Sequence, residues 1–84
     1  MAVIVPSNTI GWAVARMRDG ARVRRAGWNG KGMYVAIQSP DSGSKMTEPY
    51  VFMKTAQGGF IPWLCSQADL LAEDWELVDK EEAQ

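Results

Sequence analysis

No internal cross-link can hold this short chain together. Its 84 residues include one cysteine, Cys65, and no histidine. One cysteine cannot form an intrachain disulfide, and without histidine a zinc site would need a cluster of Asp, Glu or Cys ligands that the sequence lacks. We expect one small domain over residues 1–84, with a thin core, no metal and no cofactor. Its stability should then depend on association with further copies of the chain.

Charge is distributed unevenly along the sequence. The formal net charge of −1 disfavours long nucleic acid as a partner, because proteins that bind it are usually basic. The cations Arg16, Arg18, Arg22, Arg24, Arg25 and Lys31 nevertheless lie in the first half, and acidic residues concentrate near the end. Such asymmetry fits a localised anion site, complementary faces within an oligomer, or a solvated basic face.

No apolar run approaches the roughly 20 residues that span a bilayer. The apolar start, residues 1–6, is too short for a signal peptide and is interpreted as an N-terminal arm. We therefore expect a cytoplasmic protein with a reduced Cys65 and no membrane partner.

The apolar patterns predict an α+β fold, in which an N-terminal helix packs on a small antiparallel sheet and a short second helix precedes the last strand. Ile10, Ala13, Val14 and Met17 follow helical spacing behind capping residues, which predicts a helix over residues 8–19 with Gly20 as its terminator. A capping box predicts a short helix from Ser66 to about Ala72. Extended segments are predicted at 22–26, 33–37, 50–54, 60–64 and 74–78. Residues 38–49 are predicted to form a long loop and 79–84 a frayed acidic tail.

Glycines are crowded into the segment from Arg24 to Gly32. Asn29-Gly30 is a strong turn signal, and the closely spaced glycines could present backbone N–H groups to an anion. Arg25 and Lys31 could add charged contacts to a pyrophosphate. Taken alone, the segment is better explained as a tight turn before a strand.

The chain contains 4 tryptophans, and an indole can stack on a nucleobase for about 1–3 kcal/mol. Trp75 alternates with polar neighbours and is predicted to be core. Trp28, in the glycine-rich segment, and Trp63, just before the capped helix, are the preferred ligand contacts.

Catalysis has little support in the sequence. Without histidine the usual Ser–His and Cys–His pairs are impossible. Asp69, Glu73 and Asp74 could supply an acid and a base, but helix capping explains Ser66 and Asp69 sufficiently. We expect no catalytic residue and no enzymatic activity.

Taken together, three blocks of sequence resemble a phage-encoded family. They are Val23 to Met33, then Met53-Lys54-Thr55-Ala56 before a glycine turn, then Pro62-Trp63-Leu64 with Ser66-Gln67, Asp69, Leu71-Ala72 and Asp74-Trp75. From about Ile10 to Val78 the chain is similar to the Thoeris anti-defence two family. This resemblance implies a homotetrameric sponge, with pockets between protomers, that binds the immune signal glycocyclic ADP-ribose intact. Some members of the family also hold cyclic oligonucleotides of the CBASS type.

The resemblance, combined with the residue types, assigns expected ligand roles. Trp28 and Trp63 would flank the base, and Arg25, Lys31 or Lys54 would face phosphate. Ribose hydroxyls or base edges would be bound by Asn29, Ser66, Asp69 and Asp74. Ile10 and Met53 would line the pocket, although phenylalanine is common in the family at the position of Ile10 and proline at that of Cys65. Two alternatives remain: a hydrolase of the same signal, and an inhibitor that binds an immune effector protein.

Overall fold

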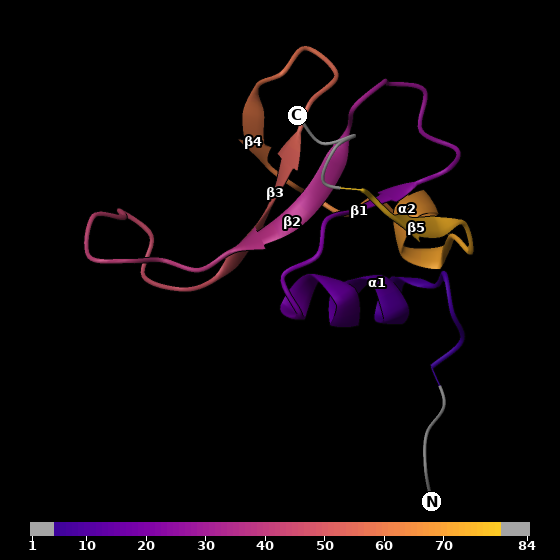
Figure 1. The fold of residues 1–84 in the computed structure, drawn as a ribbon, viewed down its shortest axis with the longest axis horizontal. Helices are drawn as coiled ribbons and strands as arrows, with labels where there is room; N and C mark the ends of the chain where they lie inside the picture. The colour runs from indigo at the N-terminus through magenta and orange to yellow at the C-terminus, as the bar shows by residue number, and fades with distance from the viewer. Residues whose placement is uncertain (1–4, 80–84) are drawn as a thin grey trace, which may run out of the picture.

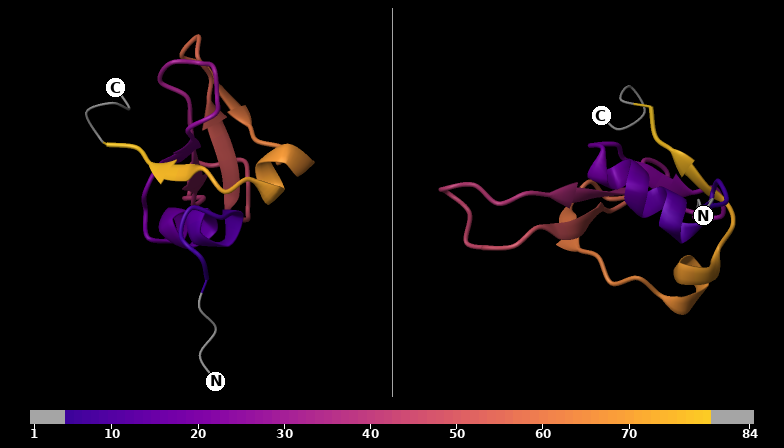
Figure 2. Two further views of the ribbon diagram at one scale, coloured as in Figure 1. Left: turned by 90° about the vertical axis from the view of Figure 1, so that its right-hand side faces the viewer. Right: turned by 90° about the horizontal axis from the view of Figure 1, so that it is seen from below.

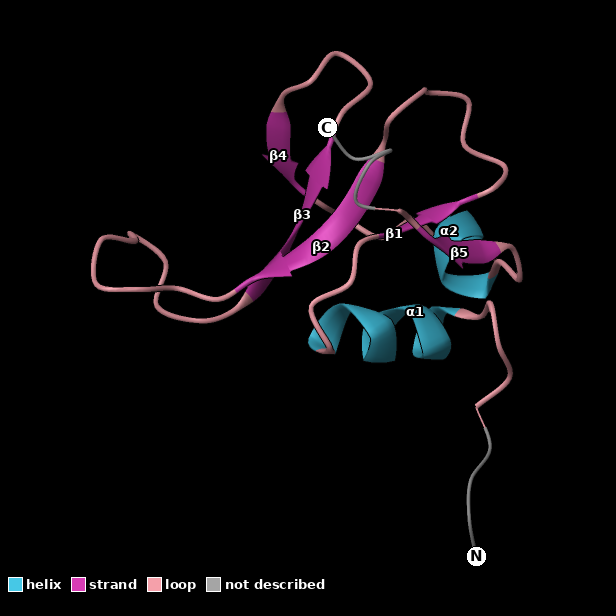
Figure 3. Ribbon diagram, viewed as in Figure 1, coloured by secondary structure: helices cyan, strands magenta, loops and turns pink. Residues whose placement is uncertain are grey.

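The computed structural model describes residues 5–79 and has the predicted α+β architecture (Figures 1 and 3). Its elements, in chain order, are α1 (Ile10–Arg18), β1 (Val23–Arg25), β2 (Tyr34–Gln38), β3 (Tyr50–Lys54), β4 (Phe60–Pro62), α2 (Gln67–Leu71) and β5 (Trp75–Leu77). The predicted strands are confirmed: β3 has its predicted bounds and β2 is shifted by one residue, while β1, β4 and β5 are each two residues shorter than the extended sequence patterns. The predicted frayed tail falls almost wholly outside the described residues, as do positions 1–4 of the N-terminal arm.

The strands form one antiparallel sheet of 5 strands in the order β4-β3-β2-β1-β5. Pro62 lies on β4, at the edge of the sheet, as expected of a residue with no N–H to donate. The glycine turn at 57–59 joins β3 to β4 as predicted, and Gly58 adopts the positive φ of 92° that the turn requires.

The core lies between the sheet and α1. Ala13 and Met17 of α1 pack with Val23, Val35 and Trp75, and all five are almost fully buried. Val23, Val35 and Met53 lie opposite one another in the register, so they point to the same face of the sheet. The prediction that Trp75 is a core residue is confirmed.

The beginning of α1 differs from the expectation. The helix starts at Ile10, and Asn8 lies outside it with φ of 71°. Asn8 donates its side-chain N–H to the carbonyl of Trp75 at 2.6 Å, and the Trp75 N–H donates back to the carbonyl of Asn8 at 3.1 Å. Asn8 therefore ties the chain to β5 instead of capping α1. The other end is as predicted: Gly20 follows the C-cap, and the N–H groups of Gly20 and Ala21 donate to Met17 and Arg16 in a Schellman arrangement.

Two long connections, one between β2 and β3 and one between β1 and β2, were predicted with different success. Residues 39–49 form the predicted loop, which extends far from both helices (Figure 2). Asn29-Gly30, in contrast, does not form a tight hairpin turn. It lies inside the longer connection between β1 and β2, neither residue has positive φ, and the positive φ of 78° falls at Gly32. Trp28, which this connection carries, packs against the core cluster.

Candidate functional site

Arg25 lies at the centre of a cluster that joins β1, α2 and the start of β5. Its Nε donates to Asp74 Oδ1 and its Nη1 donates to Asp69 Oδ1, each at 2.8 Å. The register explains the first contact, because Arg25 pairs with Trp75 and Asp74 immediately precedes it. The predicted site residues Arg25, Asp69 and Asp74 are thus brought together, and the guanidinium binds both carboxylates.

The same carboxylates fasten the glycine-rich connection. Asp74 Oδ2 accepts the backbone N–H of Gly27 at 2.9 Å, and Asp69 Oδ1 accepts the indole N–H of Trp28 at 3.1 Å. The Trp28 ring also meets Trp75 edge to face, with ring centroids 5.4 Å apart. Trp28 is therefore held in one orientation by a hydrogen bond and a packing contact.

Both carboxylates are held ionised. Hydrogen bonding from Arg25 lowers the pKa of Asp74 below its usual value. Burial by itself would raise the pKa of Asp69, but hydrogen bonds from Arg25 and Trp28 outweigh it and the pKa falls. The same two acids raise the pKa of Arg25. The cluster consequently carries one positive and two negative charges near neutral pH.

Trp63 and Ser66 lie on the α2 side of this cluster. Trp63 meets Trp75 edge to face at 5.8 Å, so both predicted base contacts pack on the same buried indole. The predicted cap is confirmed: Ser66 Oγ accepts the backbone N–H of Asp69 at 3.1 Å. Trp75 adds a further bond from its indole N–H to the carbonyl of Asp69 at 3.0 Å.

A hollow of about 210 Å³ opens beside Trp28. We call it the Trp28 hollow. It is lined by Arg24, Arg25, Ala26, Trp28, Gly30, Lys31, Gly32, Met33 and Glu76. The combination of an aromatic ring with cations is the kind of surface that recognises nucleotides.

The remaining predicted residues lie farther from the cluster. Lys54 lines a neighbouring hollow at the β3–β4 turn, and Lys31 lines both this hollow and the Trp28 hollow. Ile10 and Met53 are partly buried against the core cluster, where their side chains support the fold. Asn29 is exposed on the connection between β1 and β2.

Sequence reasoning missed Arg24 and Glu76. Arg24 lines the Trp28 hollow, and its Nε donates to Glu76 Oε1 at 2.8 Å. The two residues lie opposite each other on β1 and β5. This pairing could not be seen in the sequence, because it depends on which strands are neighbours.

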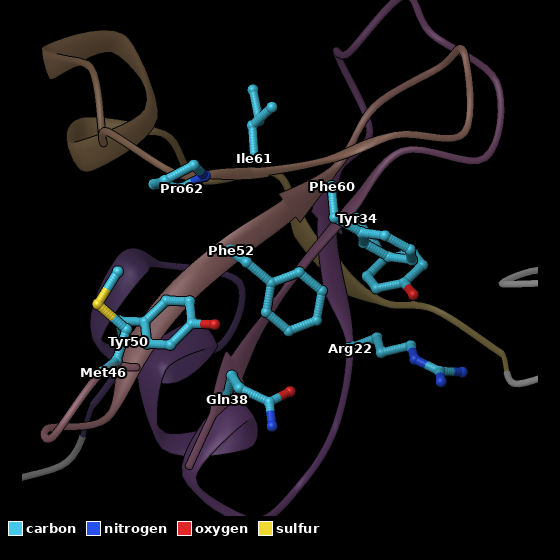
Figure 4. A pocket seen from close by; sticks show the side chains of 9 residues that line it. All are labelled: Arg22, Tyr34, Gln38, Met46, Tyr50, Phe52, Phe60, Ile61 and Pro62. Carbon is cyan, nitrogen blue, oxygen red and sulfur yellow. The ribbon is translucent and has the colours of Figure 1, made fainter. Parts of the chain in front are cut away.

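Another hollow, of about 460 Å³, lies on the sheet face opposite α1 (Figure 4). Tyr34, Phe52 and Phe60 are in edge-to-face contact there, and the guanidinium of Arg22 lies 5.1 Å from the centre of the Tyr34 ring. Tyr50 and Met46 lie at its other end (Figure 4). None of the predicted ligand contacts lines this sheet-face hollow.

Residues 5–79 contain neither a candidate metal-binding cluster nor a candidate membrane-spanning helix. Within this range no group of three or more His, Cys, Asp or Glu side chains could hold a metal ion. No helix in the same range is long and apolar enough to cross a membrane.

Comparison with known proteins gives two matches. The family model of the Thoeris anti-defense 2-like domain matches residues 8–78. The protein named Thoeris anti-defense 2 from Bacillus phage SP01 is 36% identical to this chain, and the match covers 83% of this chain and 93% of the phage protein. The matched range includes every residue of the Arg25 cluster and of the Trp28 hollow.

Proposed function

We propose that this chain, which belongs to the Thoeris anti-defense 2-like family, binds glycocyclic ADP-ribose and sequesters it without cleaving it. Membership assigns the chain to phage anti-defence against Thoeris. Sequestration in the cytoplasm of the infected bacterium would starve the immune effector of its signal. As the family resemblance implies, we extend the proposal to a homotetramer with pockets between protomers and to binding of CBASS-type cyclic oligonucleotides.

The observation that carries the proposal is the fixed position of Trp28 beside cationic side chains. A stacking platform binds best when it is already ordered, because less conformational entropy is lost when the ligand arrives. The bond to Asp69 and the contact with Trp75 supply that order. In the proposed complex Trp28 and Trp63 flank the base, Asn29 and Ser66 contact ribose or base edges, and Arg25, Lys31 or Lys54 face phosphate.

The charge state of the two acids favours binding over hydrolysis. A general acid at neutral pH needs a pKa near that pH, as in glycosidases where burial raises it. The pKa values of Asp69 and Asp74 are instead lowered, and both carboxylates are occupied by Arg25. They are therefore suited to positioning and poorly suited to proton transfer.

Recovery of the ligand tests the proposal directly. The protein is incubated with glycocyclic ADP-ribose, separated from free ligand by filtration and then heat-denatured. Release of intact ligand in proportion to protein supports sequestration, whereas release of a hydrolysis product identifies a hydrolase. If calorimetry and thermal-shift assays detect no binding of this ligand or of a cyclic dinucleotide, the proposal fails. The alternative function, an inhibitor that docks on an effector protein, is then favoured.

Trp28→Ala should weaken ligand binding roughly 10- to 100-fold, because a stacked aromatic ring contributes about 1–3 kcal/mol. Trp28→Phe is the matched variant, since it keeps an aromatic face but loses the N–H that binds Asp69. We expect it to retain more affinity than Trp28→Ala in isothermal titration. Binding by Trp28→Ala as tight as that of the wild type would remove Trp28 from the site.

A further inference from the structure

The hydrogen bonds of Trp28 lead back to Arg25. The indole N–H of Trp28 donates to Asp69 Oδ1 at 3.1 Å, and Arg25 Nη1 donates to that same oxygen at 2.8 Å. The backbone N–H of Trp28 donates to the carbonyl of Arg25 at 3.1 Å, which closes a tight turn between the two residues. Both the ring and the backbone of Trp28 are therefore placed relative to Arg25.

Asp74 restrains the residue immediately before Trp28. Its Oδ1 accepts the Nε–H of Arg25, and its Oδ2 accepts the backbone N–H of Gly27 at 2.9 Å. The N–H of Ala26 donates to the Asp74 carbonyl at 3.0 Å, so this part of the connection lies alongside the start of β5. Because a guanidinium is planar and presents its donors in fixed directions, one Arg25 side chain can orient two carboxylates at once.

Asp69 is also restrained at its backbone. Ser66 accepts its N–H, and the indole N–H of Trp75 donates to its carbonyl. With the backbone fixed, the position of the carboxylate depends on its rotamer, and the bond from Arg25 selects that rotamer. Arg25 thus determines where the oxygen that receives the Trp28 indole N–H lies.

The charge of this cluster opposes a direct contact between Arg25 and phosphate. The lowered pKa values of Asp69 and Asp74 keep both carboxylates ionised near neutral pH. Each carboxylate lies 2.8 Å from the guanidinium, so one positive charge faces two negative charges. A phosphate that approached the cluster would meet a net negative charge, and like charges repel.

Gly27 allows the connection to come this close to the cluster. A Cβ at this position would lie 3.0 Å from Asp74 Oδ2 and 3.6 Å from Arg25 Nη2. The first distance is too short for an ordinary van der Waals contact, so an added methyl group would displace the Asp74 carboxylate. The φ of Gly27 is not positive, so alanine adds crowding without backbone strain. Gly27→Ala therefore perturbs the cluster without removing a charge.

We infer that Arg25 is a positioning residue for Trp28: it acts through the two carboxylates and makes no contact with ligand phosphate. Of the three cations that the proposed complex offers to phosphate, Arg25 is thereby given a different role. Without it the Trp28 ring remains but is free to turn, and ligand binding then has to order it. The inference depends on the proposed function for the identity of the ligand, whereas the restraint on Trp28 does not.

The restraint on Trp28 can be measured without ligand. In ¹⁵N-labelled protein, the indole N–H signal of Trp28 is identified by its loss in Trp28→Phe. We expect this signal to shift in Gly27→Ala and to exchange with water at least about tenfold faster than in the wild type. Gly43→Ala is the matched control, because the nearest atom to its added Cβ is Asp41 Oδ1 at an ordinary 3.5 Å. An unchanged Trp28 signal in folded Gly27→Ala would overturn the inference.

Arg25→Lys separates positioning from charge. Lysine keeps the positive charge but lacks the planar fork that binds both carboxylates. We expect the same change in the Trp28 signal, and a dissociation constant for glycocyclic ADP-ribose roughly 3- to 10-fold weaker than that of the wild type, because the ligand must order one more side chain. Arg18→Lys, at an exposed position of α1, should stay within about twofold of the wild type, as for most surface substitutions.

The outcomes of Arg25→Lys are distinct from those of the proposed function. Wild-type affinity in Arg25→Lys would mean that charge alone matters at this position and would overturn the inference. If the wild type does not bind glycocyclic ADP-ribose, the proposed function fails, and the inference about the ligand fails with it. The Trp28 signal then still decides whether Arg25 restrains the ring, and Arg25→Lys provides that signal if Gly27→Ala does not fold.

Discussion

Asp69 connects more of the candidate site than its position in a short helix suggests. Its carboxylate binds Arg25 and Trp28, its N–H binds Ser66, and its carbonyl accepts the indole N–H of Trp75. The bond to Ser66 could be predicted, because a capping box spans neighbouring residues. The bonds to Arg25 and Trp28 could not, since these residues are 44 and 41 positions away along the chain.

Acid should destabilise the protein through Asp69 and Asp74. Both pKa values are lowered in the folded state, so their ionised forms stabilise it above the unfolded value of about 3.9. That stabilisation is fully present at neutral pH and is lost as the pH falls below about 4 through the folded-state values. Urea unfolding from pH 7 to pH 2.5 should show this loss in the free energy of unfolding.

Asp74→Asn should be less stable than the wild type at pH 7, and the difference should shrink as the pH falls. Glu48→Gln is the control, since it removes a carboxylate from the exposed 39–49 loop. It should follow the wild-type curve closely. A stability difference for Asp74→Asn that is constant across this pH range would contradict the role of the ionised carboxylate.

Among the elements, the sequence predicted helix ends and turns correctly where the conformation depends on residues close together in the chain. Gly20 ends α1 and the 57–59 turn joins β3 to β4, because φ preferences act within a few residues. The start of α1 and the Asn29-Gly30 segment were predicted less well. In both places a distant partner, Trp75 or the β3–β4 turn, decides the backbone conformation.

Ser66→Ala should lower the stability of the protein by about 1 kcal/mol, because it removes the N-cap acceptor of α2. Ser42→Ala, in the exposed 39–49 loop, should have almost no effect on urea unfolding. Ligand titration of the same variants separates two roles of Ser66. Affinity within about twofold of the wild type means that Ser66 acts as a cap alone, whereas a larger loss supports the proposed ribose contact.

At the scale of the whole molecule, the two faces of the sheet are unequal. One packs against α1 and contains the core, while the other presents Tyr34, Phe52 and Phe60 around the sheet-face hollow (Figure 4). The side chain of Phe60 is 64% exposed, and Met46 and Ile61 are about half exposed. The sequence shows that the chain is rich in aromatic residues. It does not show which face of the sheet each one occupies, because that depends on strand order and register.

The proposed homotetramer offers a reason for this apolar exposure, because contiguous exposed apolar patches mark interaction surfaces. We expect Phe60→Glu to reduce the mass measured by size-exclusion chromatography with light scattering, since a buried unpaired carboxylate opposes association. Leu71→Glu makes the same kind of change on α2, where Leu71 is 76% exposed, and should leave the mass unchanged. If Leu71→Glu dissociates the oligomer and Phe60→Glu does not, the contact between protomers lies at α2 and not at the sheet-face hollow. If the wild type runs at its monomer mass of 9.3 kDa at every concentration tested, each ligand site must be complete within one chain.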